Sequence, residues 1–104
     1  MTIMIEKVHI TVLVENTAEG PSLLAEHGLA FHIQLASQSV LFDTGQGRIL
    51  MFNAYRLGLS LQQVHAVVLS HGHYDHTGGL ADALRGNRLA AIYAHPAALE
   101  PKFA

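Results

Sequence analysis

The chain has 104 residues, a length that permits one domain with a modest hydrophobic core. It contains no cysteine, which excludes disulfide scaffolds, thiolate zinc sites and a cysteine nucleophile. The formal charge is −2 and the basic residues form no stripe, so we expect no binding to nucleic acid. No apolar run is long enough to span a bilayer, so we expect a cytoplasmic protein that does not bind membranes.

Strand-like alternation of apolar and polar residues dominates the first part of the chain. It extends over residues 1–15, is interrupted by a loop of turn-forming residues at 16–21, and resumes over 29–36. His32 falls on the polar face of the second strand by this alternation. A short turn then leads into a third strand at 40–43, and the spacing predicts an antiparallel hairpin.

Helices and strands interleave in the rest of the chain. The predicted elements are a helix over 49–57, a wholly apolar and therefore buried strand over 66–69, a helix over 78–84, a strand over 89–94 and a short helix beginning at Pro96. Gly58 is a plausible end for the first of these helices. The fold class is therefore α/β, and residues 1–104 form a single domain.

Residues 70–79, with the sequence SHGHYDHTGG, lie between the buried strand and the next helix and carry most of the chemistry. In extended backbone His71 and His73 project to the same side, so this pair can ligate one metal. Asp75 and His76 come where the chain turns toward the helix, and they can point to a second metal position a few ångströms away. Imidazole and carboxylate suit Zn, Mn, Fe or Ni. The alternative, a polar surface loop in a histidine-rich chain, does not explain the placement at a strand end.

These residues resemble the signature of the metallo-β-lactamase fold superfamily of dinuclear metal hydrolases. Residues 40–45, VLFDTG, resemble that superfamily's upstream strand motif. The flanking segments VEN at 14–16, EHG at 26–28, FDTGQ at 42–46, VVLSHGH at 67–73 and YAHP at 93–96 resemble its dihydropterin-ribofuranosylaminobenzene-phosphate synthase-like branch. The resemblance implies the N-terminal half of an αββα sandwich, a mixed sheet with helices on one face.

The resemblance also implies roles for the motif residues. His71 and His73 would hold one of two divalent metal ions, and Asp75 and His76 would hold the other. Zinc is the preferred metal for both positions. Asp43 would lie beneath the site and orient the ligands through hydrogen bonds, although a turn also favours Asp at this position. The implied reaction is attack by a metal-activated hydroxide on an ester, phosphoester or amide-type small molecule, with Asp75 also taking part in proton transfer.

Two further histidines are candidates for the edge of the substrate site. His27 lies in the loop that the chain shares with the resembling branch, and His95 lies at a strand end before Pro96. Loop residues at strand ends carry function more often than lone histidines elsewhere, which are usually structural.

The chain departs from the family downstream of the motif. Members supply further metal ligands from segments well beyond it. In this chain the only candidate ligands after the predicted helix are His95 and Glu100. Charged residues make up 13% of the chain, against about 25% in ordinary soluble domains. Both observations indicate an apolar sheet face that has no layer of its own to pack against. A surface formed simply by Ala, Gly, Ser and Gln is the alternative.

Three explanations of this departure stay open. We favour a half-protein completed by a second copy of the chain or by another polypeptide. A truncated reading frame that binds metal weakly is the second explanation, and a smaller site completed by His95 and Glu100 is the third. The corresponding functional alternative to a hydrolase is a noncatalytic, metal-binding half-domain that acts by associating with another chain.

Overall fold

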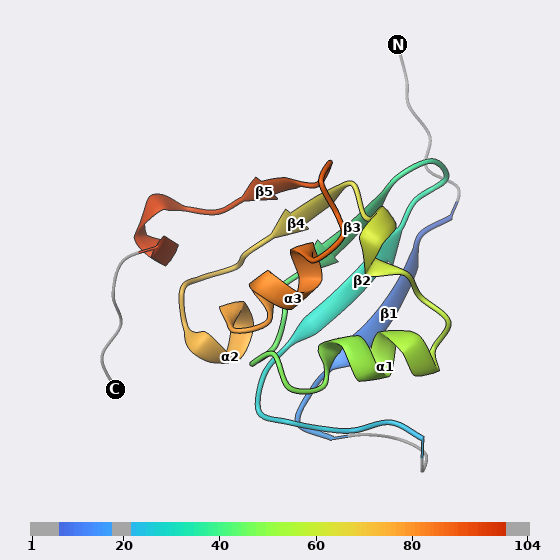
Figure 1. The fold of residues 1–104 in the computed structure, drawn as a ribbon, viewed down its shortest axis with the longest axis horizontal. Coiled ribbons are helices and arrows are strands. Elements are labelled where there is room, and N and C mark those ends of the chain that lie inside the picture. The colour runs from blue at the N-terminus through green and yellow to red at the C-terminus, as the bar shows by residue number, and fades with distance from the viewer. Residues whose placement is uncertain (1–6, 18–21, 100–104) are drawn as a thin grey trace.

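The computed structural model describes residues 7–17 and 22–99. Five strands form one sheet in the order β1-β2-β3-β4-β5 (Figure 1). Their bounds are β1 His9–Val14, β2 Ala30–Gln34, β3 Ser39–Phe42, β4 Ala66–Val68 and β5 Ala91–Tyr93. The first three strands pair antiparallel, which confirms the predicted hairpin, and β3, β4 and β5 pair parallel. The sheet is therefore mixed, as the predicted fold class requires.

The helical elements are short. They are α1 Leu50–Arg56, α2 Tyr74–Thr77 and α3 Leu80–Leu84, with single 3₁₀ turns η1 Leu61–Gln63 and η2 Pro96–Leu99. Gly58 has φ +73°, a backbone conformation that stops α1 as predicted. One expectation was incomplete, because α2 begins four residues before the helix predicted at residue 78. In the described part of the chain no helix is long and apolar enough to cross a membrane.

The hydrophobic core lies between these helices and one face of the sheet. Figure 1 shows α1 and α3 in front of the same face. Leu41 and Val67, from the two central strands, are fully buried there, and they meet Leu50 of α1 and Ala83 of α3, each 1% exposed. A fully buried leucine contributes about 1.5–3 kcal/mol to stability, so this layer accounts for the packing that holds β3 and β4 in place.

The opposite face of the sheet is apolar, and no helix within residues 7–17 and 22–99 covers it. The strand register aligns its side chains in two rows that cross all five strands. The rows consist of Ile10, Ile33, Val40, Ala66 and Ala91, and of Val12, Phe31, Phe42, Val68 and Tyr93. None of these ten residues is buried, and Ile10 is 62% exposed. We call these ten residues the open sheet face.

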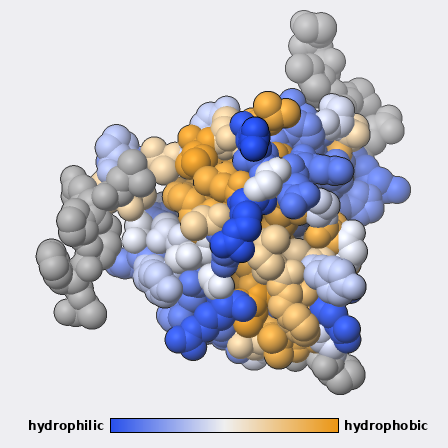
Figure 2. Space-filling view, in the orientation of Figure 1, coloured by the Kyte–Doolittle hydropathy of each residue, from blue (hydrophilic) through white to orange (hydrophobic). Residues whose placement is uncertain are grey.

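The helix side of the molecule carries a smaller apolar surface. Figure 2, which has the orientation of Figure 1, shows apolar residues over the region of α1, with hydrophilic residues beside them. Met51 and Phe52 of that helix are exposed, and the Arg56 guanidinium carbon lies 5.8 Å from the centre of the Phe52 ring. A charged group therefore borders the apolar residues of α1, whereas the two rows of the open sheet face contain none.

His32 lies on the covered face, so the expectation that it belongs to a solvated polar face was wrong. It pairs with Thr11 and Leu41 in the sheet and is only 6% exposed. Alternation shows which side chains share a face, but the helices decide which face is buried. Burial lowers the pKa of the His32 imidazole below its ordinary value of 6.5, because the charged form loses its water.

The lowered pKa gives His32 a predictable effect on stability. As the pH falls below 6.5, the unfolded chain takes up this proton more readily than the folded one. The contribution of the neutral His32 ring to the free energy of unfolding is therefore fully present above pH 6.5, and it declines as the pH falls below that value. A His32→Leu variant should lose less stability between about pH 7.5 and pH 5.5 than the wild type does, measured by urea unfolding at both pH values. An equal loss in the two proteins would contradict this prediction.

Candidate metal centre

The site is built where the parallel strands β3 and β4 end side by side. Phe42 and Val68, the last residues of these strands, are paired, and Asp43 and Ser70 follow close behind. Asp43 is fully buried and has φ +59°, a backbone region that costs energy for any residue except glycine. Its N–H donates to the Val68 carbonyl over 2.8 Å, which holds this conformation against the strand end.

The Asp43 carboxylate connects to two of the motif histidines. Its Oδ1 accepts from the Ser70 N–H at 2.8 Å, and its Oδ2 accepts from the Ser70 hydroxyl at 2.6 Å. The same Oδ2 lies 2.8 Å from Nδ1 of His76. The Ser70 hydroxyl oxygen lies 2.8 Å from Nδ1 of His71. A single buried carboxylate thus orients one ring directly and the other through Ser70.

This network fixes which ring nitrogens carry protons. A carboxylate can only accept, so Nδ1 of His76 is the donor to Asp43. Ser70 has one hydroxyl proton and gives it to Asp43, so Nδ1 of His71 must donate to the Ser70 oxygen. In their neutral form both rings therefore have a lone pair on Nε2, the form in which imidazole binds a metal ion.

Thr44 holds α2 against the end of β3. Its N–H and its hydroxyl both donate to the His76 carbonyl, at 2.8 and 3.0 Å. The N–H of Gly79 in turn donates to the Thr44 hydroxyl oxygen at 3.0 Å. Because α2 is only four residues long, these contacts, rather than its own hydrogen bonds, place Asp75 and His76.

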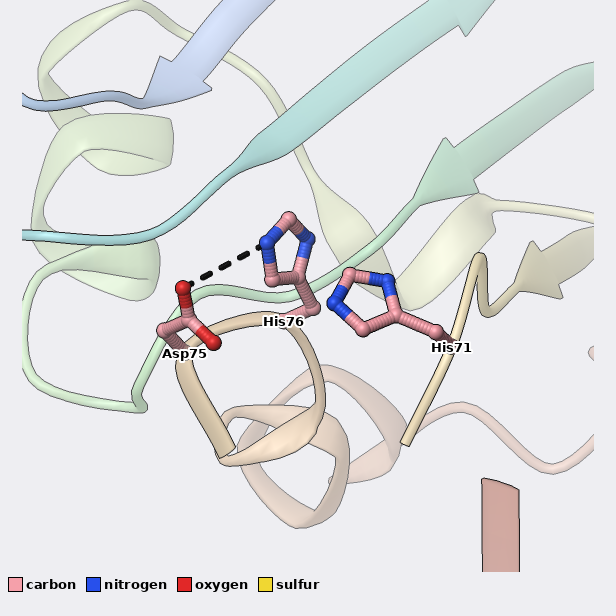
Figure 3. Close-up of side chains that lie close together, drawn as sticks. All are labelled: His71, Asp75 and His76. Atoms are coloured by element: carbon pink, nitrogen blue, oxygen red, sulfur yellow. Dashed lines mark ion pairs between the residues drawn. The ribbon is translucent and has the colours of Figure 1, made fainter. Parts of the chain in front are cut away.

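His71, Asp75 and His76 form one cluster, in which one ligand atom from each residue lies within 4.8 Å of the others (Figure 3). Nε2 of His76 lies 3.4 Å from Oδ2 of Asp75, and the ring centres of His71 and His76 are 4.1 Å apart. With neutral rings, that nitrogen and that oxygen are both acceptors, and a divalent cation between them would satisfy both. The donor set therefore fits a metal ion. His73 is exposed and lies outside this group of three, with its ring centre 4.8 Å from that of His71 and the two rings nearly perpendicular.

Of the remaining predicted site residues, the structure brings His27 to the cluster and places His95 in a separate turn. Nε2 of His27 lies 3.1 Å from Oδ2 of Asp75, with 75% of the His27 side chain exposed. His95 is exposed, and its Nδ1 accepts from the Ala97 N–H at the start of η2. Glu100 lies outside the described residues. Ser70 and Thr44 were not predicted as site residues, and the only clue to Ser70 in the sequence is a hydroxyl directly before His71.

Replacing Asp43 with asparagine should weaken the binding of a divalent metal ion at this cluster, with Zn²⁺ as the probe. An amide nitrogen in place of Oδ2 donates to Ser70 and His76 rather than accepting from them, and it drives both rings to the Nε2–H form. We expect zinc affinity to fall about 10- to 100-fold, the usual cost of losing an outer hydrogen-bond partner of metal ligands. Competition with a chromophoric chelator measures the affinity, and ¹⁵N spectra of the rings report the proton positions. Unchanged ring spectra would contradict the assignment.

Comparison with known proteins identifies relatives of this chain. The family model for the metallo-beta-lactamase superfamily matches residues 25–103. An uncharacterized protein of Methanocaldococcus jannaschii is 35% identical over 96 residues, covering 91% of this chain and 37% of that protein. The 7,8-dihydropterin-6-methyl-4-(beta-D-ribofuranosyl)-aminobenzene-5'-phosphate synthase of the same organism is 33% identical over 107 residues. The match covers 96% of this chain and 36% of that protein.

A solved structure agrees with these matches. MIM-2 metallo-beta-lactamase superposes with a TM-score of 0.58 at 38% identity, covering 67% of this chain and 27% of that one. The chain thus spans little more than a third of the length of the curated relatives and about a quarter of the solved structure.

Proposed function

Since the chain belongs to the metallo-beta-lactamase superfamily, we propose that it forms the N-terminal part of a metal-dependent hydrolase. The observation that carries this proposal is the cluster of His71, Asp75 and His76, in which Asp43 leaves the Nε2 lone pairs of both rings free for a metal. Because the chain spans only part of its relatives, activity in this proposal includes completion of the site by further polypeptide.

The proposed cofactor is a pair of divalent ions, for which zinc is the preferred metal and Mn, Fe and Ni are the alternatives. His71, His73, Asp75 and His76 would hold them. When bound by these residues, the ions would supply a hydroxide nucleophile near neutral pH for an ester, phosphoester or amide-type small molecule. Asp75, which is 22% exposed, is the group that we propose for proton transfer. Asp43 keeps the rings in the metal-binding form throughout.

Metal analysis combined with a substrate panel tests the proposal. Chelator-treated protein is dialysed against Zn²⁺ or Mn²⁺, analysed for bound metal, and assayed on phosphodiesters and lactones. We expect this chain to take up metal, and we expect metal-dependent hydrolysis, abolished by a second chelator treatment, once further polypeptide completes the site. No uptake of any divalent ion would overturn the proposal. Uptake without turnover in the completed protein would favour the second candidate function instead.

The second candidate is a noncatalytic, metal-binding half-domain that acts by association, and the open sheet face favours it. We propose that a second copy of the chain covers this face. The two rows carry no charged residue, so two like faces can meet without repulsion. Sheets pack about 10 Å apart in this way, and the helices of each copy would lie outside, completing a four-layer sandwich.

Light scattering after gel filtration measures this association. We expect twice the chain mass of 11.3 kDa. A Phe31→Glu variant places a carboxylate within the open sheet face and should be monomeric, because burying an unpaired charge is costly. The matched control is Tyr55→Glu, at a position 81% exposed on α1. A monomeric wild type, or a Phe31→Glu variant that still dimerises, would contradict the assembly.

A further inference from the structure

The loop between β1 and β2 brings a histidine from outside the motif to the candidate metal centre. Nε2 of His27 lies 3.1 Å from Oδ2 of Asp75, within reach of a charge-assisted hydrogen bond. We propose that His27 is a positioning residue that donates this hydrogen bond and holds the Asp75 carboxylate in its metal-binding orientation. This inference rests on the proposed function, since it concerns a ligand of that metal centre.

Hydrogen-bond chemistry distinguishes His27 from the motif histidines. A carboxylate accepts only, so a neutral His27 must carry its proton on Nε2 to bond Asp75. His71 and His76 carry theirs on Nδ1, which leaves Nε2 for the metal. The His27 nitrogen nearest the cluster is thus a donor and unavailable to a metal ion. That arrangement suits an outer partner of a ligand.

The Asp75 carboxylate depends on this one donor. Among the described residues, the only other ion-pair contact of its oxygens is to Nε2 of His76 at 3.4 Å, and that nitrogen carries no proton in the assigned form. A ligand carboxylate in a metal site is ordinarily held by a hydrogen bond as well as by the metal. His27 supplies that bond, as Asp43 does for the two rings.

The loop that carries His27 is fastened to the backbone of Asp75. The Asp75 carbonyl accepts from the Leu29 N–H at 3.3 Å. Gly28 has φ +153° and passes so close that a Cβ at this position would lie 2.5 Å from the same carbonyl oxygen. The His27 carbonyl accepts from the side-chain amide of Gln46 at 2.5 Å. The backbone at His27 and directly after it is therefore anchored, which limits where its ring can go although the side chain is exposed.

Zinc affinity of the whole chain, measured by chelator competition, tests the role with two substitutions. We expect His27→Ala to weaken zinc binding about tenfold, the lower end of the effect of losing an outer partner. His27→Gln, whose amide N–H reaches the same carboxylate oxygen, should restore affinity to near the wild-type value. His9→Ala, at an exposed position in β1, is the matched control and should change nothing. Urea unfolding without metal shows whether each variant is folded.

The outcomes separate the role of His27 from the metal centre that it serves. If wild-type protein binds no zinc, the metal centre itself fails and the role of His27 fails with it. If the wild type binds zinc and His27→Ala binds it equally well, only the role of His27 is overturned. If both substitutions weaken binding equally, His27 does more than donate a hydrogen bond, and the positioning role is also overturned. Recovery with glutamine alone supports it.

Discussion

A His76→Ala variant is expected to lose more than about 100-fold in zinc affinity, a larger loss than the removal of any outer hydrogen-bond partner produces. The His76 side chain contacts both other members of the cluster and the buried Asp43 carboxylate. Its Nδ1 is tied to Asp43, its Nε2 faces Asp75 at 3.4 Å, and its ring centre lies 4.1 Å from that of His71. Removing it takes away a metal ligand and one of the hydrogen bonds to the Asp43 carboxylate.

The fold should tolerate this change. The His76 side chain is 18% exposed, and the backbone contacts that hold α2 run through the His76 carbonyl, which alanine keeps. Asp43 retains both of its hydrogen bonds from Ser70. Isothermal titration with Zn²⁺ measures the affinity, with His9→Ala as control, and circular dichroism verifies the fold. Near-wild-type affinity in a folded His76→Ala protein would show that the metal is bound elsewhere.

The elements that could be located from the sequence are those with a strong local signal. Residues 66–69 form a continuous apolar run, and β4 occupies Ala66–Val68 with Val67 fully buried. Gly58 and Gly86 both adopt positive φ at the ends of α1 and α3, where few other residues fit. The motif histidines were recognised by residue type and spacing, which require no knowledge of tertiary structure.

Two features could not be predicted because they depend on distant contacts. Alternation in β2 grouped Phe31 with Ile33, but which face the helices cover is decided by packing, so His32 was assigned to the wrong environment. The helix α2 has only four residues and no periodicity, and it depends on Thr44, 32 positions away from His76. The Asp43–Ser70 contact arises only when β3 and β4 pair in parallel.

A Gly79→Ala substitution should lower the free energy of unfolding by about 2–3 kcal/mol, because it forces overlap in a packed interior. Gly79 is buried, and a Cβ there would overlap the Thr44 backbone oxygen and lie 3.2 Å from the Thr44 carbonyl carbon. Backbone atoms cannot turn aside as a flexible side chain can. The φ of Gly79 is −89°, so alanine is conformationally allowed and the whole penalty is steric.

Gly58→Ala is the informative control, because it separates the energetic cost of a left-handed backbone conformation from the cost of steric overlap. Gly58 has φ +73° but nothing within 4 Å of a Cβ, so alanine there costs only the left-handed backbone penalty of about 1 kcal/mol. Urea unfolding should rank Gly79→Ala well below Gly58→Ala in stability, and the reverse order would contradict close packing between residues 44 and 79. Since Thr44 also holds the His76 carbonyl, a displaced Thr44 shifts α2. Zinc affinity should therefore fall in Gly79→Ala and not in Gly58→Ala, because only the former disturbs the backbone that places the ligands.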